Sequence, residues 1–283
     1  MTSYNKISKE WDNAGESWAD FVREGKDYFR EEMNKPAFYE VIGDVKGKSI
    51  LDLACGEGYN TRILAKMGAR VVGADFSSKL IELAKQRDAL DGFGINYYQS
   101  DAAKLEKFSN DQFDTVTCFM ALMDIESYVE AISEVARVLK TNGRFIFSIT
   151  HPCFEVGTCI DGEEYADWRV EEGQEKTEIT QNLVIKNYFH TCGGEVAWTM
   201  ERLIKPFKTT SFHRTLTDYF NSLSVSGFVV ARLVEPRPTP KGVSSYASLR
   251  KHMRIPHSVI FEAIKWSAAE KYIPHLNPNS LRY

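Results

Sequence analysis

Long apolar runs are missing from this sequence: no stretch approaches the ~20 residues that a membrane-spanning helix needs. The first residues carry neither the apolar centre of a signal peptide nor a glycine for myristoylation. Internal repeats and low-complexity tracts are also missing. Cysteine is scarce, with five residues in 283, and an odd number in a chain of this length is typical of reduced thiols. We therefore expect a cytoplasmic protein with no membrane partner.

The composition is that of an ordinary globular protein, since 43% hydrophobic residues suffice for a sizeable core. The net charge of −4 is unevenly spread, because residues 200–283 hold 13 Lys and Arg against 5 Asp and Glu. This basic excess is either a solvated surface or a region that attracts an anionic substrate or RNA. Basic and aromatic residues do not alternate there, so a nucleic-acid partner is not expected.

Residues 49–75 carry the most informative pattern. A short apolar run contains one acid, Asp52, and breaks into a turn with Gly56 and Gly58. A helical segment follows, and a second apolar run ends on Asp75. This order of strand, glycine turn, helix and strand with a terminal acid predicts half of a nucleotide-binding α/β sheet, with Asp75 accepting hydrogen bonds from two ribose hydroxyls.

A dinucleotide would suit this pattern only in part. The third glycine of the dinucleotide fingerprint is missing, because position 61 is Thr. Asp52 and Glu57 also place negative charge where a pyrophosphate would sit, at a helix N-terminus. A ligand with an ammonium and a sulfonium group fits the acidic turn better, and S-adenosylmethionine is such a ligand.

Five segments in order resemble the motifs of class I S-adenosylmethionine-dependent methyltransferases. They begin at residues 51, 75, 100, 113 and 139, and the first has Ala54 where many members have glycine. The resemblance implies methyl transfer to a small-molecule acceptor, with S-adenosylhomocysteine as product. It also implies that the cofactor is bound by Asp52, Ala54, Cys55, Gly56, Gly58, Asp75, Phe76, Asp101, Ala102, Phe119 and Met120.

The expected fold is α/β: a doubly wound, mostly parallel seven-stranded sheet with an inserted β-rich cap and an N-terminal helical lid. We place the lid at residues 1–45, the cofactor-binding core at 46–150, the cap at 151–212 and the rest of the core at 213–283. The last part should contain a helix at 215–224 and an antiparallel hairpin at 228–234 and 258–264. Further helices are expected at 78–90 and 127–139.

Three aromatic side chains and one arginine of the predicted lid allow two interpretations. Trp11, Trp18, Tyr28 and Arg30 could close over the cofactor, with Arg30 reaching its carboxylate. Alternatively, the aromatic rings are simply the apolar face of a docked helix.

Two histidines are candidate catalytic bases. His151 directly follows the fifth predicted strand, at the edge where parallel sheets place ligands, and His213 precedes a predicted helix. Their structural alternatives are a histidine that holds the turn before Pro152 and one that caps the helix.

The predicted cap contains five residues of types that bind metals: His151, Cys153, Cys159, His190 and Cys192. The spacing does not match that of structural zinc sites, and free cysteines behave equally well as small apolar residues. No metal is therefore expected.

Other functions stay open at this stage. The basic C-terminal part would also suit an RNA or a protein or peptide as methyl acceptor. Asp75 would suit an NAD(P)-dependent oxidoreductase or a noncatalytic nucleotide-binding module. The sequence indicates neither the methylated atom nor the oligomeric state.

The pattern makes one quantitative prediction. Substitution of Asp75 by Ala should weaken cofactor binding by roughly 1–3 kcal/mol, because both ribose hydroxyls lose a charged acceptor. Calorimetric titration with S-adenosylhomocysteine measures this loss, and NADH serves as the control ligand. An unchanged affinity would show that the second strand has been assigned wrongly.

Overall fold

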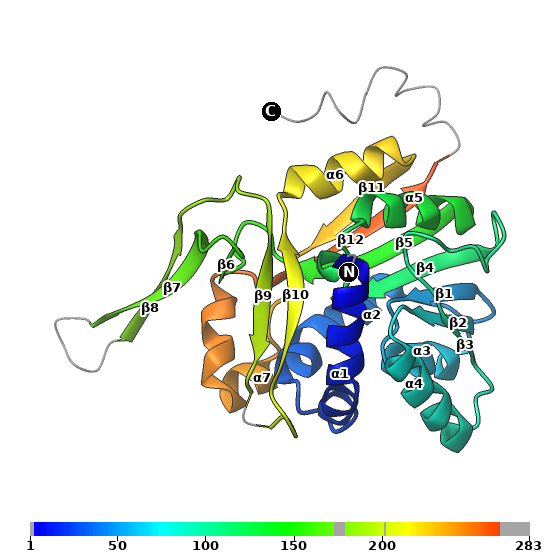
Figure 1. Cartoon of the computed structure of the whole chain (residues 1–283), viewed down its shortest axis with the longest axis horizontal. Helices are drawn as coiled ribbons and strands as arrows, with labels where there is room; N and C mark the ends of the chain where they lie inside the picture. The colour runs from blue at the N-terminus through cyan, green and yellow to red at the C-terminus, as the bar shows by residue number, and fades with distance from the viewer. Residues whose placement is uncertain (1–2, 173–178, 201, 267–283) are drawn as a thin grey trace.

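The computed structural model describes residues 3–172, 179–200 and 202–266 (Figure 1). The helices are α1 (Ser3–Arg23), α2 (Lys35–Ile42), α3 (Tyr59–Lys66), α4 (Ser78–Asp91), α5 (Tyr128–Val138), α6 (Leu216–Val225) and α7 (Pro240–Ser245), with a π-helical turn η1 (Arg30–Asn34) and 3₁₀ segments η2 (Leu122–Asp124) and η3 (Ala247–Met253). The strands are β1 (Ser49–Leu53), β2 (Arg70–Asp75), β3 (Asn96–Gln99), β4 (Phe113–Phe119), β5 (Leu139–Thr150), β6 (Gly157–Thr158), β7 (Glu164–Glu172), β8 (Ile179–Ile185), β9 (Cys192–Trp198), β10 (Phe207–His213), β11 (Phe228–Val234) and β12 (Ser258–Lys265).

Seven strands form the central sheet, in the order β11-β12-β5-β4-β1-β2-β3. The five strands from β5 to β3 in this order run parallel, whereas β12 pairs antiparallel with both β5 and β11. This confirms the predicted mostly parallel seven-stranded sheet and its antiparallel hairpin. The parallel strands therefore bring their carboxyl ends to one edge, where such sheets bind ligands.

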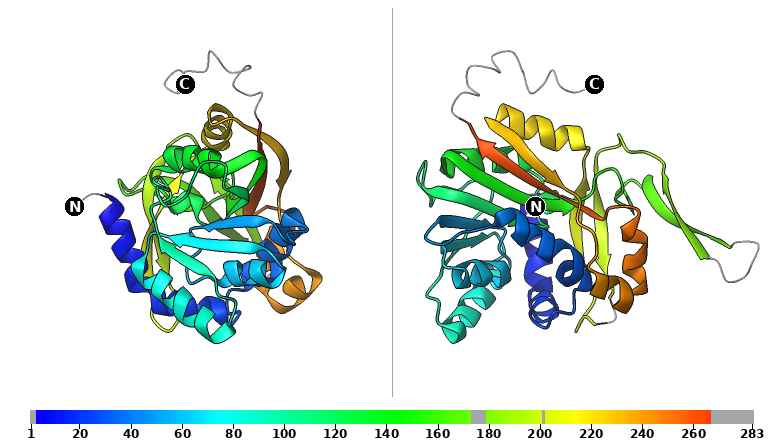
Figure 2. Two further views of the ribbon diagram at one scale, coloured as in Figure 1. Left: turned by 90° about the vertical axis from the view of Figure 1, so that its right-hand side faces the viewer. Right: turned by 180° about the vertical axis from the view of Figure 1, so that it is seen from behind.

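Alternation along the strands explains why helices cover both faces of the sheet (Figure 2). In β5, Phe145 and Phe147 pack in one apolar cluster with α5 and α6, and Ile146 between them joins a second cluster with α2 and α3. Successive side chains of a strand point to opposite faces, so a strand that is apolar throughout must be buried on both. The helices predicted at 78–90, 127–139 and 215–224 are confirmed as α4, α5 and α6.

The chain between β5 and α6 is rich in strands, as predicted. Strands β6, β7 and β8 form one small sheet, and β9 pairs antiparallel with β10. The hairpin of β7 and β8 extends away from the central sheet (Figure 1). Cys159 and Cys192 are joined here by a disulfide, so the expectation of reduced thiols is wrong for this pair. The other three cysteines are free thiols.

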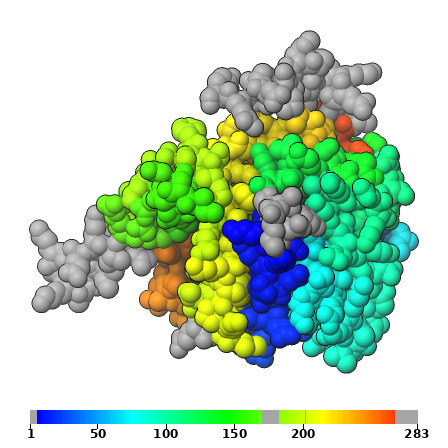
Figure 3. Space-filling view, in the orientation of Figure 1, coloured from blue at the N-terminus to red at the C-terminus, as the bar shows by residue number. Residues whose placement is uncertain are grey.

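Helix α1 lies across the surface between β10 and α4 (Figure 3). Ile7, Ala14, Phe21 and Val22 recur at helical spacing and are buried. Polar contacts fix the other sides of the helix: Asp12 accepts hydrogen bonds from the Ser77 hydroxyl and the Lys79 amide, and Glu10 accepts one from the Thr210 amide. The N-terminal helix is therefore docked on two parts of the molecule at once.

The boundaries proposed for the lid, core and cap stay a prediction, and their residues 1–2, 173–178, 201 and 267–283 lie outside the described residues. Within the described part of the chain, no helix combines the length and the apolar character that crossing a membrane requires.

Candidate active site

A cavity of about 680 Å³ lies at the carboxyl edge of the parallel strands. Its walls come from the turn after β1, the ends of β2 and β4, the segment after β3, and α1. Of the predicted cofactor residues it is lined by Ala54, Cys55, Gly56, Asp75, Phe76, Asp101, Ala102, Phe119 and Met120. The structure thus brings nine of the eleven to one cavity, and Asp52 and Gly58 are not among its lining residues.

Asp75 connects the turn after β1 to the start of α4. Its carboxylate accepts hydrogen bonds from the Gly56 amide at 2.8 Å and from the Ser77 amide at 2.9 Å. A carboxylate has about four lone-pair positions, so two of them stay available for a ligand. Burial raises the pKa of Asp75 to about 6. Asp75 therefore shapes the turn in addition to facing the cavity.

Backbone conformation in this turn is unusual. Ala54 adopts φ 53°, a left-handed conformation that a side chain with a Cβ adopts only at a cost. Gly58, at φ 79°, begins α3, and a Cβ there would lie 2.6 Å from the Tyr97 hydroxyl. The role of Gly58 seen in the structure is thus close packing of the turn.

The charge of the turn is balanced from within the protein. Glu57 is buried and pairs with Arg62 at 2.9 Å and with Arg23 of α1 at 2.7 Å. Two guanidinium groups therefore neutralise the carboxylate. The expectation that Glu57 would repel a pyrophosphate is wrong for this reason.

Asp52 accepts hydrogen bonds from two threonine hydroxyls, Thr61 at 2.6 Å and Thr117 at 2.9 Å. Burial raises its pKa to about 6. These contacts join β1 to β4 and α3. A direct role of Asp52 in cofactor binding stays a prediction.

Arg30 is the cation of the cavity best placed to bind a carboxylate. Its guanidinium donates to the Asn60 side chain at 2.8 Å and lies over the rings of Tyr59 and Phe119. The side chain is buried, and its Nε has no hydrogen-bond partner within the described residues. A buried donor without a partner is costly, so a ligand oxygen at this position would be stabilised.

Trp11, Trp18 and Arg30 of the predicted lid line the cavity, whereas Tyr28 stacks on Tyr246 elsewhere.

Neither candidate histidine lies in the cavity lining. His151 Nε2 contacts Glu235 at 3.0 Å, its Nδ1 accepts from the Cys153 amide, and burial lowers its pKa. His213 contacts the Tyr188 carbonyl through Nε2 and stacks on Tyr165. Both rings therefore hold cap segments in place, and the structure does not bring them to the reacting end of the cavity.

Asp124 was missed by the sequence reasoning. It ends η2, five residues after the end of β4, and lines the cavity. It accepts a hydrogen bond from the Ser211 hydroxyl, and burial raises its pKa to about 7. The residue after His213, Arg214, donates to the carbonyls of Leu122 and Ile125 and so fixes this segment. No local signal marks it in the sequence, because four residues separate it from the end of β4.

Comparisons with known proteins agree with this geometry. Residues 51–147 match the family model described as a methyltransferase domain. The crystal structure of an S-adenosylmethionine-dependent methyltransferase from Mesorhizobium loti superposes with a TM-score of 0.64 and 26% identity, covering 81% of this chain and 96% of that one.

Two named relatives are similar over a shorter region. A ubiquinone biosynthesis O-methyltransferase of Coxiella burnetii is 35% identical over 122 residues, 43% of this chain and 52% of the relative. A demethylmenaquinone methyltransferase of Clavibacter sepedonicus is 35% identical over 116 residues, 41% of this chain and 46% of the relative. The chain thus spans about half the length of these relatives.

Sheet order, cavity and comparisons define a class I methyltransferase fold with its ligand site at the carboxyl edge. The chain carries a methyltransferase domain at residues 51–147 and is similar over most of its length to an S-adenosylmethionine-dependent methyltransferase, and S-adenosylmethionine is its cofactor. The dinucleotide alternative is thereby set aside.

The left-handed conformation of Ala54 yields a stability prediction. Ala54→Gly should raise the free energy of unfolding by about 1 kcal/mol, because glycine removes the strain of the positive φ. Gly58→Ala is the matched control and should lower the same quantity by about 1–3 kcal/mol. Urea denaturation measures both. Destabilisation by Ala54→Gly would show that the turn is not strained.

Arg30 yields a binding prediction. Arg30→Met keeps the apolar contacts with Tyr59 and Phe119 and removes the charge, so S-adenosylhomocysteine should bind about 10–100-fold more weakly, as expected for a lost hydrogen bond between charged groups. Methylthioadenosine lacks the amino-acid carboxylate and is the control ligand. Its affinity should stay unchanged by calorimetry. An equal loss for both ligands would contradict carboxylate binding by Arg30.

Proposed function

We propose that this chain transfers the methyl group of S-adenosylmethionine to a small, flat and largely apolar acceptor that carries a hydroxyl group. The proposal rests on one observation: the predicted cofactor residues and an apolar wall of α1 line a single cavity. The same space is lined by the cofactor residues at the strand ends and by Ile7, Trp11, Trp18 and Val22 of α1. Its volume of about 680 Å³ lies within the usual range of small-molecule sites.

The aromatic wall supports a flat acceptor. Trp18 lies 5.1 Å from Trp198 of β9 between ring centroids, and Trp198 stacks on Phe207 of β10 at 5.6 Å. Trp11 also contacts both cap rings. Rings that support one another in this way give a rigid apolar surface, which suits a planar ligand.

Asp124 is our candidate general base. A carboxyl group with a pKa near 7 is half ionised at neutral pH and can take the proton of an acceptor hydroxyl. The acceptor oxygen then attacks the methyl carbon in line with the sulfur. The carbon–sulfur bond breaks, the electron pair stays on sulfur, and S-adenosylhomocysteine leaves as a neutral thioether. Beyond this proton, the protein supplies alignment and a dry site.

The charge of the lining favours a neutral or cationic acceptor over an anionic one. Asp124, Glu126 and Glu130 are among the lining residues. The basic C-terminal segment, which suggested an anionic acceptor or RNA, contributes none of the lining residues within the described chain. Its Lys241 pairs with Glu32, and Lys251 lies over the ring of Trp168.

The named relatives support a ring compound of quinone type as acceptor, and the O-methyltransferase among them supports oxygen as the methylated atom. One is described as an O-methyltransferase of ubiquinone biosynthesis and the other as a demethylmenaquinone methyltransferase. They match less than half of this chain, so the acceptor wall of this chain must be tested directly. Incubation of the full chain with S-adenosylmethionine and a panel of phenols, catechols and hydroquinones, with release of S-adenosylhomocysteine as readout, provides this test. Turnover of amines or RNA but of no hydroxylated ring would refute the proposal.

The general base yields a prediction for the accepted substrate. Asp124→Asn should lower kcat/KM by about 10²–10⁴-fold, because the amide cannot take the proton. In the unaltered enzyme the rate should rise as pH passes through about 7, since the ionised carboxylate is the active form, and this rise should be absent in the variant.

The matched control is Glu130→Gln, which removes a second, exposed carboxylate of the same cavity. It should leave the pH profile unchanged. Affinity for S-adenosylhomocysteine, measured by calorimetry, should be the same in both variants. An Asp124→Asn enzyme that keeps both its rate and its pH profile would exclude Asp124 as the base.

A further inference from the structure

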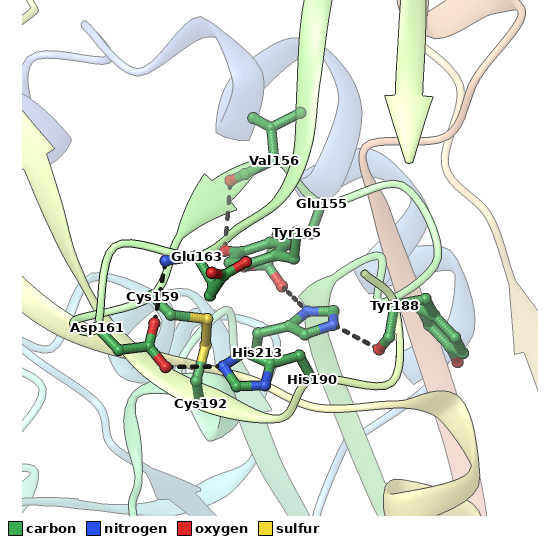
Figure 4. The surroundings of a disulfide bond; sticks show 10 residues. All are labelled: Glu155, Val156, Cys159, Asp161, Glu163, Tyr165, Tyr188, His190, Cys192 and His213. Atoms are coloured by element: carbon green, nitrogen blue, oxygen red, sulfur yellow. Dashed lines mark hydrogen bonds and ion pairs between the residues drawn. A yellow bond between two sulfur atoms is a disulfide. The ribbon is translucent and has the colours of Figure 1, made fainter. Parts of the chain in front are cut away.

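Three side chains of types that bind transition metals gather in the cap, outside the cofactor cavity: Cys159, His190 and Cys192 (Figure 4). Their ligand atoms lie within 4.8 Å of one another. Cys159 precedes β7, whereas His190 and Cys192 stand at the start of β9, so the cluster joins two segments 33 residues apart at its cysteines. In this structure the two cysteines form a disulfide.

We propose that the reduced form of this cluster binds one Zn²⁺ through the thiolates of Cys159 and Cys192 and the imidazole of His190. Two thiolates and an imidazole are a ligand set that zinc prefers, and it excludes the hard cations calcium and magnesium. Three protein ligands leave a fourth tetrahedral position for water. His190 is partly exposed, so solvent reaches the cluster.

Backbone contacts hold the two segments together independently of the sulfur atoms. The Ile160 amide donates to the Gly193 carbonyl at 3.0 Å and so joins the two segments, and the Cys159 amide donates to the Glu163 carbonyl at 2.8 Å within the first of them. The Cα atoms of the cysteines lie 5.7 Å apart. Two thiolates on one tetrahedral zinc lie about 3.7 Å from each other. Rotation of the cysteine side chains supplies this separation, and the strands need not come apart.

Asp161 prepares the histidine for this role. Its carboxylate lies 2.9 Å from His190 Nε2 (Figure 4). A carboxylate at this nitrogen favours the tautomer with the proton on Nε2, which leaves the lone pair of Nδ1 for a metal. Metal-binding histidines are commonly held by a carboxylate in this way. Asp161 is thus proposed as a positioning residue.

Formation of the zinc site takes two steps: the disulfide is reduced, and the thiols then release their protons as the metal binds. A dithiol reductant gives two electrons and two protons to the disulfide, breaks its sulfur–sulfur bond and is itself oxidised to a disulfide. Zn²⁺ then displaces one proton from each of the two thiols. The pair is therefore either a disulfide or part of a metal site.

The sequence reasoning dismissed a metal because the spacing did not match. The spacing is Cys-x-Asp at residues 159–161 and His-x-Cys at 190–192. Packing of the two segments against each other, which spacing alone does not reveal, brings the two pairs together. His151 and Cys153, the other residues considered, are not part of the cluster.

The test uses the full chain, reduced under argon with a phosphine reductant and titrated with zinc chloride against a chromophoric chelator. We expect one equivalent of zinc per reduced chain and none per disulfide-bonded chain. Cobalt(II) in place of zinc should give the charge-transfer absorption of thiolate ligands. A reduced chain that takes up no stoichiometric metal would overturn the proposal.

Variants assign the ligands. Cys192→Ser and His190→Ala should abolish stoichiometric binding, and Asp161→Asn should weaken it by about 10–100-fold. Cys153→Ser is the matched control, because this free thiol of the same cap lies outside the cluster, and it should bind zinc as the unaltered chain does. Binding of S-adenosylhomocysteine verifies that each variant is folded. Retention of zinc by the folded Cys192→Ser or His190→Ala variant would refute the assignment.

Discussion

The hydrogen bonds of the Asp75 carboxylate are the constraint on which the cofactor site depends. They join the Gly56 amide of the turn after β1 to the Ser77 amide at the start of α4. The two crossover turns of the parallel sheet are thereby fixed relative to each other, and the cavity opens between them. Because the carboxylate is buried, its two amide partners also offset the cost of removing a charge from water. The cofactor residues before and after Asp75 take their positions from this contact.

Helix α1 is positioned by the same turns. Asp12 accepts from the Ser77 hydroxyl and the Lys79 amide at the start of α4, and Arg23 pairs with Glu57 beside Gly56. The helix that carries Trp11 and Trp18 into the cavity is thus attached to the cofactor turns and, through Glu10, to β10 of the cap. Cofactor binding and the acceptor wall are therefore mechanically linked, since a shift of either turn would move the tryptophans.

The sequence predicts those features that depend on neighbours along the chain. An apolar run that breaks into a glycine turn located β1, and one that ends in an acid located β2; periodicity located α4, α5 and α6 within one or two residues. The cofactor edge follows, because parallel strands must bring residues such as Asp75 and Asp101 together at their carboxyl ends. Even Ala54, where the motif usually has glycine, keeps the left-handed conformation of the turn.

Features that depend on distant partners escaped prediction. The charge of Glu57 is cancelled by Arg23, 34 residues earlier in the chain, so the sequence overstated the acidity of the turn. The disulfide of Cys159 and Cys192 depends on the contact between the segment after β6 and the start of β9. Asp124 looked unremarkable in the sequence because its distinctive environment comes from Ser211 of β10. In each case the partner lies on an element whose packing the local pattern does not specify.

The cofactor residues and the residues of the proposed acceptor wall lie in different parts of the chain. The region that matches the family model, residues 51–147, contains β1 to β4 and most of β5, and with them the turns that bind the cofactor. Trp11, Trp18, Arg30 and Trp198 lie outside it, yet they line or support the same cavity. A methyl donor common to the family needs the same turns in each member, whereas the acceptor is contacted by segments added before and after them. The family match over residues 51–147 therefore accounts for the cofactor site, and the identity of the acceptor must be sought in α1 and the cap.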